Sequence, residues 1–139
     1  MEDHKHSSLS KRIFATLIDY IVVLTFFFLY IIKFGEPNEN GSYTIYGLQN
    51  LIPLGFWFIY LIVFESIFEA SIGHYILGLK VIKCDGGRID LIDSILRHII
   101  DPIDFLPIGI PAIICIENTP LHQRLGDLCA KTIVVKDVN

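Results

Sequence analysis

Charged side chains stand in or beside the long apolar runs of this sequence, which is an unusual place for them. They are Arg12, Asp19, Glu65 and Asp104. An ionisable group at membrane depth costs at least ~2.5 kcal/mol unless it faces protein or water. Two kinds of role are compatible with these residue types. They could bind an ion, a proton or a substrate, or they could form a structural clasp in which opposite charges hold helices together.

Arg12 and Asp19 stand seven positions apart, which places them on one face of a helix. Their backbones would lie ~10 Å apart along the helix axis, so a contact would require Arg12 to bend inward. Ala15 lies between them on the same face, and a small residue there lets a second helix approach closely. We therefore expect Asp19 to face the interior of a helix bundle.

Two apolar runs are long enough to cross a membrane. Residues 13–32 would rise ~30 Å as a helix, which matches the hydrocarbon thickness of a bilayer. This run is longer than the ~7–15-residue core of a signal peptide, and no small-x-small cleavage site follows it. We therefore interpret it as a retained transmembrane helix. Residues 51–68 form the second run, and Pro53 and Gly55 near its start predict a kink there.

A third apolar run, residues 102–116, is short and is interrupted by prolines and a glycine. It predicts a kinked span or a re-entrant segment, because a broken helix at membrane depth needs cover from protein. Before it, residues 79–83 have strand character and residues 85–88 have the composition of a hairpin turn. The β-rich run 132–136 would otherwise be a lone strand, so we expect it to lie near residues 79–84 and pair with them.

The predicted fold class is therefore a membrane all-α protein with two full transmembrane helices, a third short, Pro/Gly-broken segment, and a short cytoplasmic β-hairpin or strand pair. A polar tail (1–10) would precede a single membrane domain (11–136). Within the domain we expect a helix at 13–32, a loop at 33–50, a helix at 51–68, a cytoplasmic segment at 69–101, the third apolar segment at 102–116 and an amphipathic tail at 120–136.

The distribution of basic residues predicts the orientation. Lys and Arg are concentrated in the N-terminal tail and in residues 70–100, whereas Lys33 is the only one between the first two apolar runs. By the positive-inside rule, the N-terminus and residues 70–100 lie in the cytoplasm and residues 34–50 lie outside. We expect a multi-pass protein of the cell (inner or plasma) membrane, with the lipid bilayer as its surroundings.

Composition and spacing argue against several other classes. The chain is 53% hydrophobic with a mean hydropathy of +0.56, which is high for a soluble domain. A net charge of -4 and the lack of a basic aromatic platform argue against nucleic acid. The three cysteines lack Cys-x-x-Cys spacing, so we expect free thiols. No nucleotide loop, zinc set or Ser-His-Asp pattern stands out, and we expect no enzyme, cofactor or metal; His74, His98 and His122 would be packing or interfacial groups.

Several blocks of the sequence form a recognisable series. In chain order they are Arg12-x-x-Ala15-x-x-x-Asp19, Gly78-Leu79-Lys80-Val81 with Asp85-Gly86-Gly87, Leu96-Arg97, Asp104-x-Leu106-Pro107, and Gln123-Arg124-Leu125-Gly126-Asp127-Leu128-x-Ala130-x-Thr132-x-Val134-Val135. Together they cover nearly all of residues 10–136, and the chain resembles the RDD family of small bacterial membrane proteins. One block departs from the pattern, because such sequences commonly carry Gly-x-Thr-x-Gly-Lys where this chain has residues 71–78.

The family is named after one arginine and two aspartates. The resemblance implies Arg12 and Asp19 as the arginine and the first aspartate, and either Asp104 or Asp127 as the second. It also implies a membrane protein for which transport is suggested, with sodium–proton exchange in some relatives. One hypothesis is an ion exchanger that acts as a homo-oligomer and uses Asp19, Asp104 and Glu65. The alternative is a non-transporting anchor or accessory protein bound to a partner membrane subunit, in which Arg12, Asp19 and Asp127 form a clasp.

Overall fold

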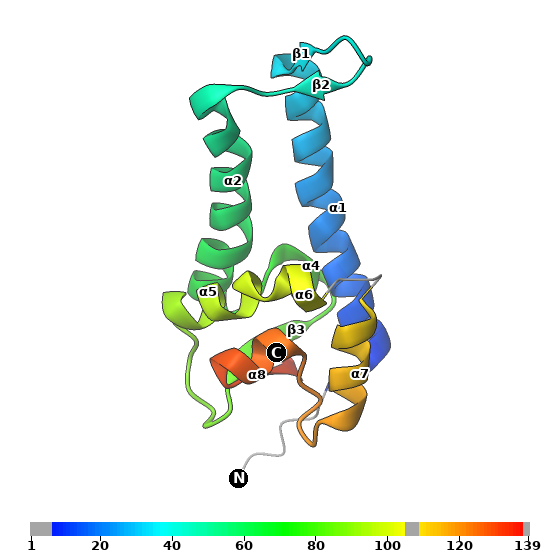
Figure 1. The fold of residues 1–139 in the computed structure, drawn as a ribbon. Coiled ribbons are helices and arrows are strands. Elements are labelled where there is room, and N and C mark those ends of the chain that lie inside the picture. Colours follow the sequence, from blue (N-terminus) through cyan, green and yellow to red (C-terminus); the bar gives the residue numbers. More distant parts are fainter. Residues whose placement is uncertain (1–6, 105–108, 138–139) are drawn as a thin grey trace.

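Two long helical rods stand side by side on a small base in the computed structural model, which describes residues 7–104 and 109–137 (Figure 1). The first rod is α1 (Leu9–Phe34). The second rod consists, without interruption, of α2 (Leu51–Trp57), the π-helical segment η2 (Phe58–Val63) and α3 (Phe64–Phe68), and a 3-10 turn, η1 (Gly47–Asn50), leads into it. Both rods are long and apolar enough to cross a membrane.

The first rod is longer at both ends than the predicted helix. Ser8 caps its beginning, since the Ser8 Oγ accepts a hydrogen bond from the Lys11 N–H at 3.4 Å. At its end the Gly35 N–H donates to the carbonyl oxygen of Ile31 at 2.7 Å. A small hairpin of β1 (Glu36–Pro37) and β2 (Tyr43–Thr44) then connects the rods at the end far from the base (Figure 1).

The irregularity of the second rod lies later than predicted. Pro53 stands in the first turn of α2, where its missing N–H is not needed by the helix. The helical hydrogen bonding instead changes to the π type over Phe58–Val63. The rods contact each other through stacked aromatic rings, because the ring centroids of Phe26 in α1 and Phe56 in α2 lie 3.8 Å apart.

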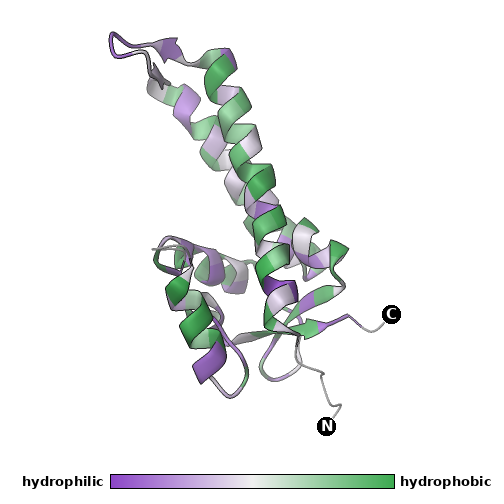
Figure 2. Cartoon of the chain, turned by 90° about the vertical axis from the view of Figure 1, so that its right-hand side faces the viewer, coloured by the Kyte–Doolittle hydropathy of each residue, from purple (hydrophilic) through white to green (hydrophobic). Residues whose placement is uncertain are grey.

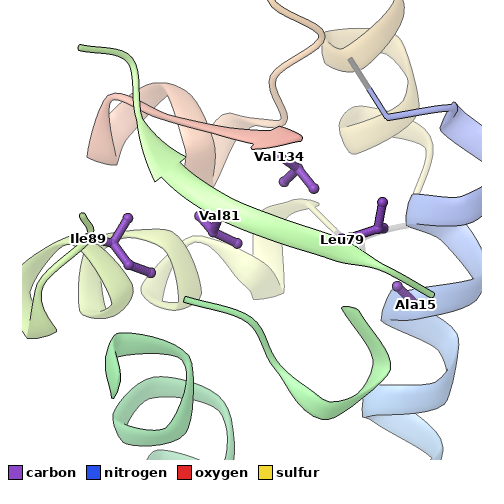
Figure 3. Close-up of a cluster of buried hydrophobic side chains, with 5 residues drawn as sticks. All are labelled: Ala15, Leu79, Val81, Ile89 and Val134. Atoms are coloured by element: carbon purple, nitrogen blue, oxygen red, sulfur yellow. The ribbon is translucent and has the colours of Figure 1, made fainter. Parts of the chain in front are cut away.

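The base comprises residues 69–104 and 109–137. Its elements are α4 (Ile72–Ile76), β3 (Leu79–Lys83), α5 (Leu91–Ile99), α6 (Asp101–Asp104), α7 (Ile110–Asn118), α8 (Leu125–Ala130) and β4 (Thr132–Lys136). The two strands are antiparallel, with Val81 opposite Val134. Figure 3 shows the cluster that they form with side chains from α1 and from the segment before α5: Ala15, Leu79, Val81, Ile89 and Val134.

The predicted hairpin after residues 79–83 is reduced to one isolated bridge between Ile82 and Arg88. The chain cannot return as a strand because Asp90 and Asp93 form a reciprocal capping box that starts α5 at Leu91. The long-range partner, β4, pairs along the other edge of β3, and on the hairpin edge the Val81 N–H donates to the carbonyl oxygen of Glu69 at 2.6 Å.

The outer surface of the rods is apolar, and hydrophobic residues run along most of their length (Figure 2). Helix α5 also exposes apolar side chains and buries charged ones. Ile92 and Ile99 are 67% and 63% exposed, whereas Arg97 and His98 are buried. Of the third apolar run, residues 105–108 lie outside the described part. The nine residues of α7 rise about 13 Å, less than half of the ~30 Å hydrocarbon layer. The described residues thus contain two membrane-length helices and no third.

Candidate functional site

Arg12 joins the first membrane-length helix to the C-terminal part of the chain. Its side chain is buried, and Nη2 lies 2.5 Å from Oδ2 of Asp127 in α8. Nη1 of the same guanidinium donates to the carbonyl oxygen of His122. Hydrogen bonds between ionised partners are among the strongest that a protein makes. The two ends of the domain are therefore tied together by one guanidinium.

Asp127 is the centre of a larger buried network. It accepts a hydrogen bond from Nη1 of Arg97, and Nε of Arg124 lies 3.7 Å from the same carboxylate. Arg97 continues the network, because its Nε lies 2.8 Å from Oε1 of Glu65 in the second rod. Burial alone would raise the pKa of Asp127, but the charges of Arg97, Arg12 and Arg124 lower it to about 2. The carboxylate is consequently ionised despite its burial.

A second arm of the network runs through His98. Its Nδ1 lies 2.7 Å from Oδ2 of Asp101 and its Nε2 lies 3.3 Å from Oε2 of Glu65. Asp101 also pairs with Nη1 of Arg124 at 2.8 Å and accepts a hydrogen bond from the Tyr20 hydroxyl at 2.6 Å. Burial would lower the pKa of His98, but these two carboxylates raise it to about 9. His98 is therefore a cation at neutral pH.

Asp19 lies in a separate group, where it anchors the beginning of α4 to the first rod. Its carboxylate accepts hydrogen bonds from the Ser71 hydroxyl at 2.5 Å and the Gly73 N–H at 2.7 Å, and Nδ1 of His74 lies 3.2 Å away. The contact is tight, since a Cβ on Gly73 would lie 2.1 Å from the carbonyl oxygen of Ala15. The small residue between Arg12 and Asp19 thus admits a short helix of the base, and Asp19 faces the protein interior.

Asp104 plays a comparable part for α8. It is fully buried and accepts hydrogen bonds from the N–H groups of Leu125 at 3.3 Å and Gly126 at 3.2 Å, at the beginning of that helix. A carboxylate is favoured there by the unsatisfied N–H groups and by the helix dipole. Gly126 permits close packing, because a Cβ on it would lie 2.3 Å from the carbonyl oxygen of Arg97.

The structure therefore distributes the five predicted site residues among three groups. Arg12 contacts Asp127, whereas Glu65 contacts Arg97, and Asp19 and Asp104 each hold the start of a helix. Arg12 and Asp19 share one face of α1, as their spacing indicates, but they bind different partners.

Four charged members of the network are not among the predicted site residues: Arg97, His98, Asp101 and Arg124. A signal for three of them exists, because Ser94, Arg97, His98 and Asp101 follow the spacing of one helical face. From the sequence, His98 is predicted only as a packing or interfacial group. The polar stripe is the buried one, which is the arrangement expected where the surroundings are lipid.

A sequence model of the RDD family matches residues 6–131. The chain belongs to the RDD family. No curated protein and no solved structure shows a significant match to it. Family membership, together with two membrane-length apolar helices, makes this chain an RDD-type membrane protein. The buried network described above therefore sits at one end of the membrane helices of an RDD protein.

The buried carboxylates in the network of this RDD protein are paired with cations. Among the described residues, no group of three or more His, Cys, Asp or Glu side chains is arranged to hold a metal ion. The carboxylates of Glu65, Asp101 and Asp127 all lie against guanidinium groups. Such an arrangement stabilises one relative placement of the helices, because a buried charge without its partner is strongly unfavourable.

Proposed function

We propose that this RDD protein is a non-transporting membrane anchor or accessory subunit, in which the buried arginines and aspartates form a structural clasp. The observation that carries the proposal is the pair between Arg12 and Asp127. Both side chains are buried, and they come from opposite ends of the chain. The clasp would hold the base against the first membrane helix so that the base presents one fixed surface to a partner membrane subunit.

The pairing of these charges supports a structural role over the transport of an ion or proton. A carrier must release its ion or proton, and this requires a carboxylate that alternates between partners. Asp127 instead touches three guanidinium groups, and Glu65 lies against Arg97 and His98. Removing one partner from a buried pair costs about 3–5 kcal/mol. A fixed arrangement is therefore the better account of this network.

The proposed placement follows the positive-inside rule. The N-terminus and the base would lie at the cytoplasmic side, the β1–β2 hairpin would lie outside, and both rods would cross the bilayer. Helix α5 would lie along the membrane surface with its exposed Ile92 and Ile99 toward lipid. The burial of its charged side chains on the opposite face supports this placement. Cysteine labelling of Cys84, in intact cells and after lysis, tests this orientation, because Cys84 is exposed on the base.

The clasp is tested by Asp127→Asn, with Asp137→Asn as the matched control at an exposed carboxylate. We expect Asp127→Asn to lower the thermal midpoint and the yield of monodisperse protein in detergent, and Asp137→Asn to change neither. Wild-type protein in liposomes should give no sodium-driven proton flux above that of empty liposomes. An unchanged midpoint in Asp127→Asn, or a clear flux from the wild type, would contradict the proposal.

Sodium–proton exchange by a homo-oligomer is the second candidate, and the surroundings of Asp19 favour it. This carboxylate lies within the first rod beside the imidazole of His74, so a proton could pass between two titratable groups. The measurement is sodium-driven proton flux in liposomes for the wild type and Asp19→Asn. Flux that disappears in a folded Asp19→Asn protein would replace the clasp proposal by this one.

A further inference from the structure

A pocket of about 450 Å³ opens between the first rod and α7, and the clasp does not account for it. Its volume lies within the ~300–1,000 Å³ range of small-molecule sites in proteins. The walls are apolar and come from both helices: Ile13 and Leu17 of α1, and Ala112, Ile113 and Ile116 of α7. Ile13 and Leu17 are also partly exposed on the outer face of the rod, so the walls continue into the surface that the bilayer would cover.

The inner end of the pocket is cationic. Arg12, Arg97 and Arg124 line it, and all three residues are buried. None of the described lining residues is acidic. Asp127, which pairs with all three of these guanidinium groups, is not among the lining residues. The pocket consequently faces the guanidinium groups, with this carboxylate outside its wall.

His74 adds a polar group to the same end. Its Nδ1 is occupied, since the Ser71 hydroxyl lies 2.7 Å and the Asp19 carboxylate 3.2 Å from it. Its Nε2 makes no hydrogen bond with any residue in the described part of the chain, and the ring lines the pocket. Arg12 is similar, because its bonds to Asp127 and His122 leave further N–H donors of the guanidinium unused by described residues.

We propose that this pocket binds an anionic phospholipid, with the phosphate against Arg12 and His74 and part of one acyl chain along the apolar wall. Guanidinium groups in a low-dielectric site bind phosphate through charge-assisted hydrogen bonds. A zwitterionic lipid would be bound less well, because the described part of the chain places no carboxylate on the pocket wall to accept its cationic head. The proposal is independent of the clasp, since a clasp can hold the base whether or not the pocket is filled.

The test uses the full chain in detergent and measures bound lipid by native mass spectrometry. The probes are phosphatidylglycerol, phosphatidylcholine and inorganic phosphate. We expect one phosphatidylglycerol per chain, bound about tenfold more tightly than phosphatidylcholine, which is the difference that one charge-assisted contact provides. Equal binding of the two lipids would overturn the proposal. Displacement of phosphatidylglycerol by inorganic phosphate at equal concentration would assign the site to a free anion and would also overturn it.

Variants of α7 locate the lipid without touching the charge network. Ala112→Trp would fill the pocket, whereas Ile114→Trp is the matched control, because Ile114 is 53% exposed and does not line the pocket. We expect Ala112→Trp to weaken phosphatidylglycerol binding at least about tenfold, with the thermal midpoint of the lipid-free protein retained, and Ile114→Trp to bind as the wild type does. Undiminished binding by Ala112→Trp would overturn the site. The change in thermal midpoint of Asp127→Asn tests only the clasp, so either proposal can fail without the other.

Discussion

The rods and the base have similar exteriors but different interiors. Both expose large apolar side chains, such as Phe28 on the first rod and Ile99 on α5. Between the rods, however, the contacts are apolar and aromatic, with Phe56 stacked on Phe26. Inside the base, Arg97 and Asp127 are among the largest fully buried side chains. The chain thus buries charge at one end of its membrane helices and apolar surface along the rest.

Different kinds of interaction specify the arrangement of the rods and that of the base. Van der Waals packing between membrane helices is gradual, so neighbouring arrangements of the rods differ little in free energy. A buried ion network is discrete, because a displaced partner leaves an uncompensated charge. We infer that contacts with the base determine the position of α1, and that the packing of the two rods adjusts to this position.

Arg97→Met should be the most damaging change, because it leaves both Glu65 and Asp127 short of a partner. We expect a loss of about 3–5 kcal/mol in the free energy of unfolding, seen as a collapse of monodisperse yield and thermal midpoint. Arg88→Met is the matched control, since Arg88 is exposed and its partner Glu69 keeps Lys80, so the loss should be at most about 1 kcal/mol. Equal effects of the two variants would refute the contrast.

Alkaline pH should weaken the base and leave the rods alone. The pKa of His98 is raised to about 9 from its ordinary value of 6.5, so its stabilisation is complete below pH 6.5 and is lost as the pH rises through 9. The full effect is on the order of 3 kcal/mol. Thermal midpoints between pH 6 and pH 10 measure it. In His98→Gln this part of the pH dependence should vanish; its persistence would assign it to other groups.

Gly73→Ala should disturb the contact of α4 with the first rod. The new Cβ would lie 2.1 Å from the carbonyl oxygen of Ala15, so the backbones must separate, at a cost of about 1–3 kcal/mol. Gly55→Ala in the second rod is the control. A Cβ on Gly55 meets nothing within 4 Å among the described residues, and alanine should there stabilise the helix by about 0.5–1 kcal/mol. We expect the thermal midpoint to fall in Gly73→Ala and to rise in Gly55→Ala, relative to the wild type.

Phe56→Leu should have the smallest effect, because the rods can repack around a smaller apolar side chain. Loss of the stack on Phe26 is expected to cost about 0.5–1.5 kcal/mol in the free energy of unfolding. Phe28→Leu is the control, since Phe28 is 64% exposed and should change nothing measurable. A larger loss in Phe56→Leu than in Arg97→Met would show that the rods, and not the base, specify the fold.

Much of the architecture could be predicted from local pattern. Hydropathy summed along the chain predicts both rods, because spanning a bilayer requires an unbroken apolar length. The pairing of residues 79–83 with 132–136 could be predicted as well, because neither strand can satisfy its backbone alone. The family resemblance is confirmed by the match over residues 6–131. These properties depend on local composition and on the spacing between nearby residues, and both can be determined from the sequence alone.

The partners of the buried charges were decided by the tertiary structure alone. Arg12 has Asp19 on its own helical face, yet its guanidinium binds Asp127 from α8. Spacing within one helix could not show this, because the choice depends on where α4 and α8 lie against α1. The same holds for α5, whose periodicity gives two possible inner faces. The environment selects between them, since water favours burying the apolar face, whereas lipid outside and a charged interior favour burying Arg97 and His98.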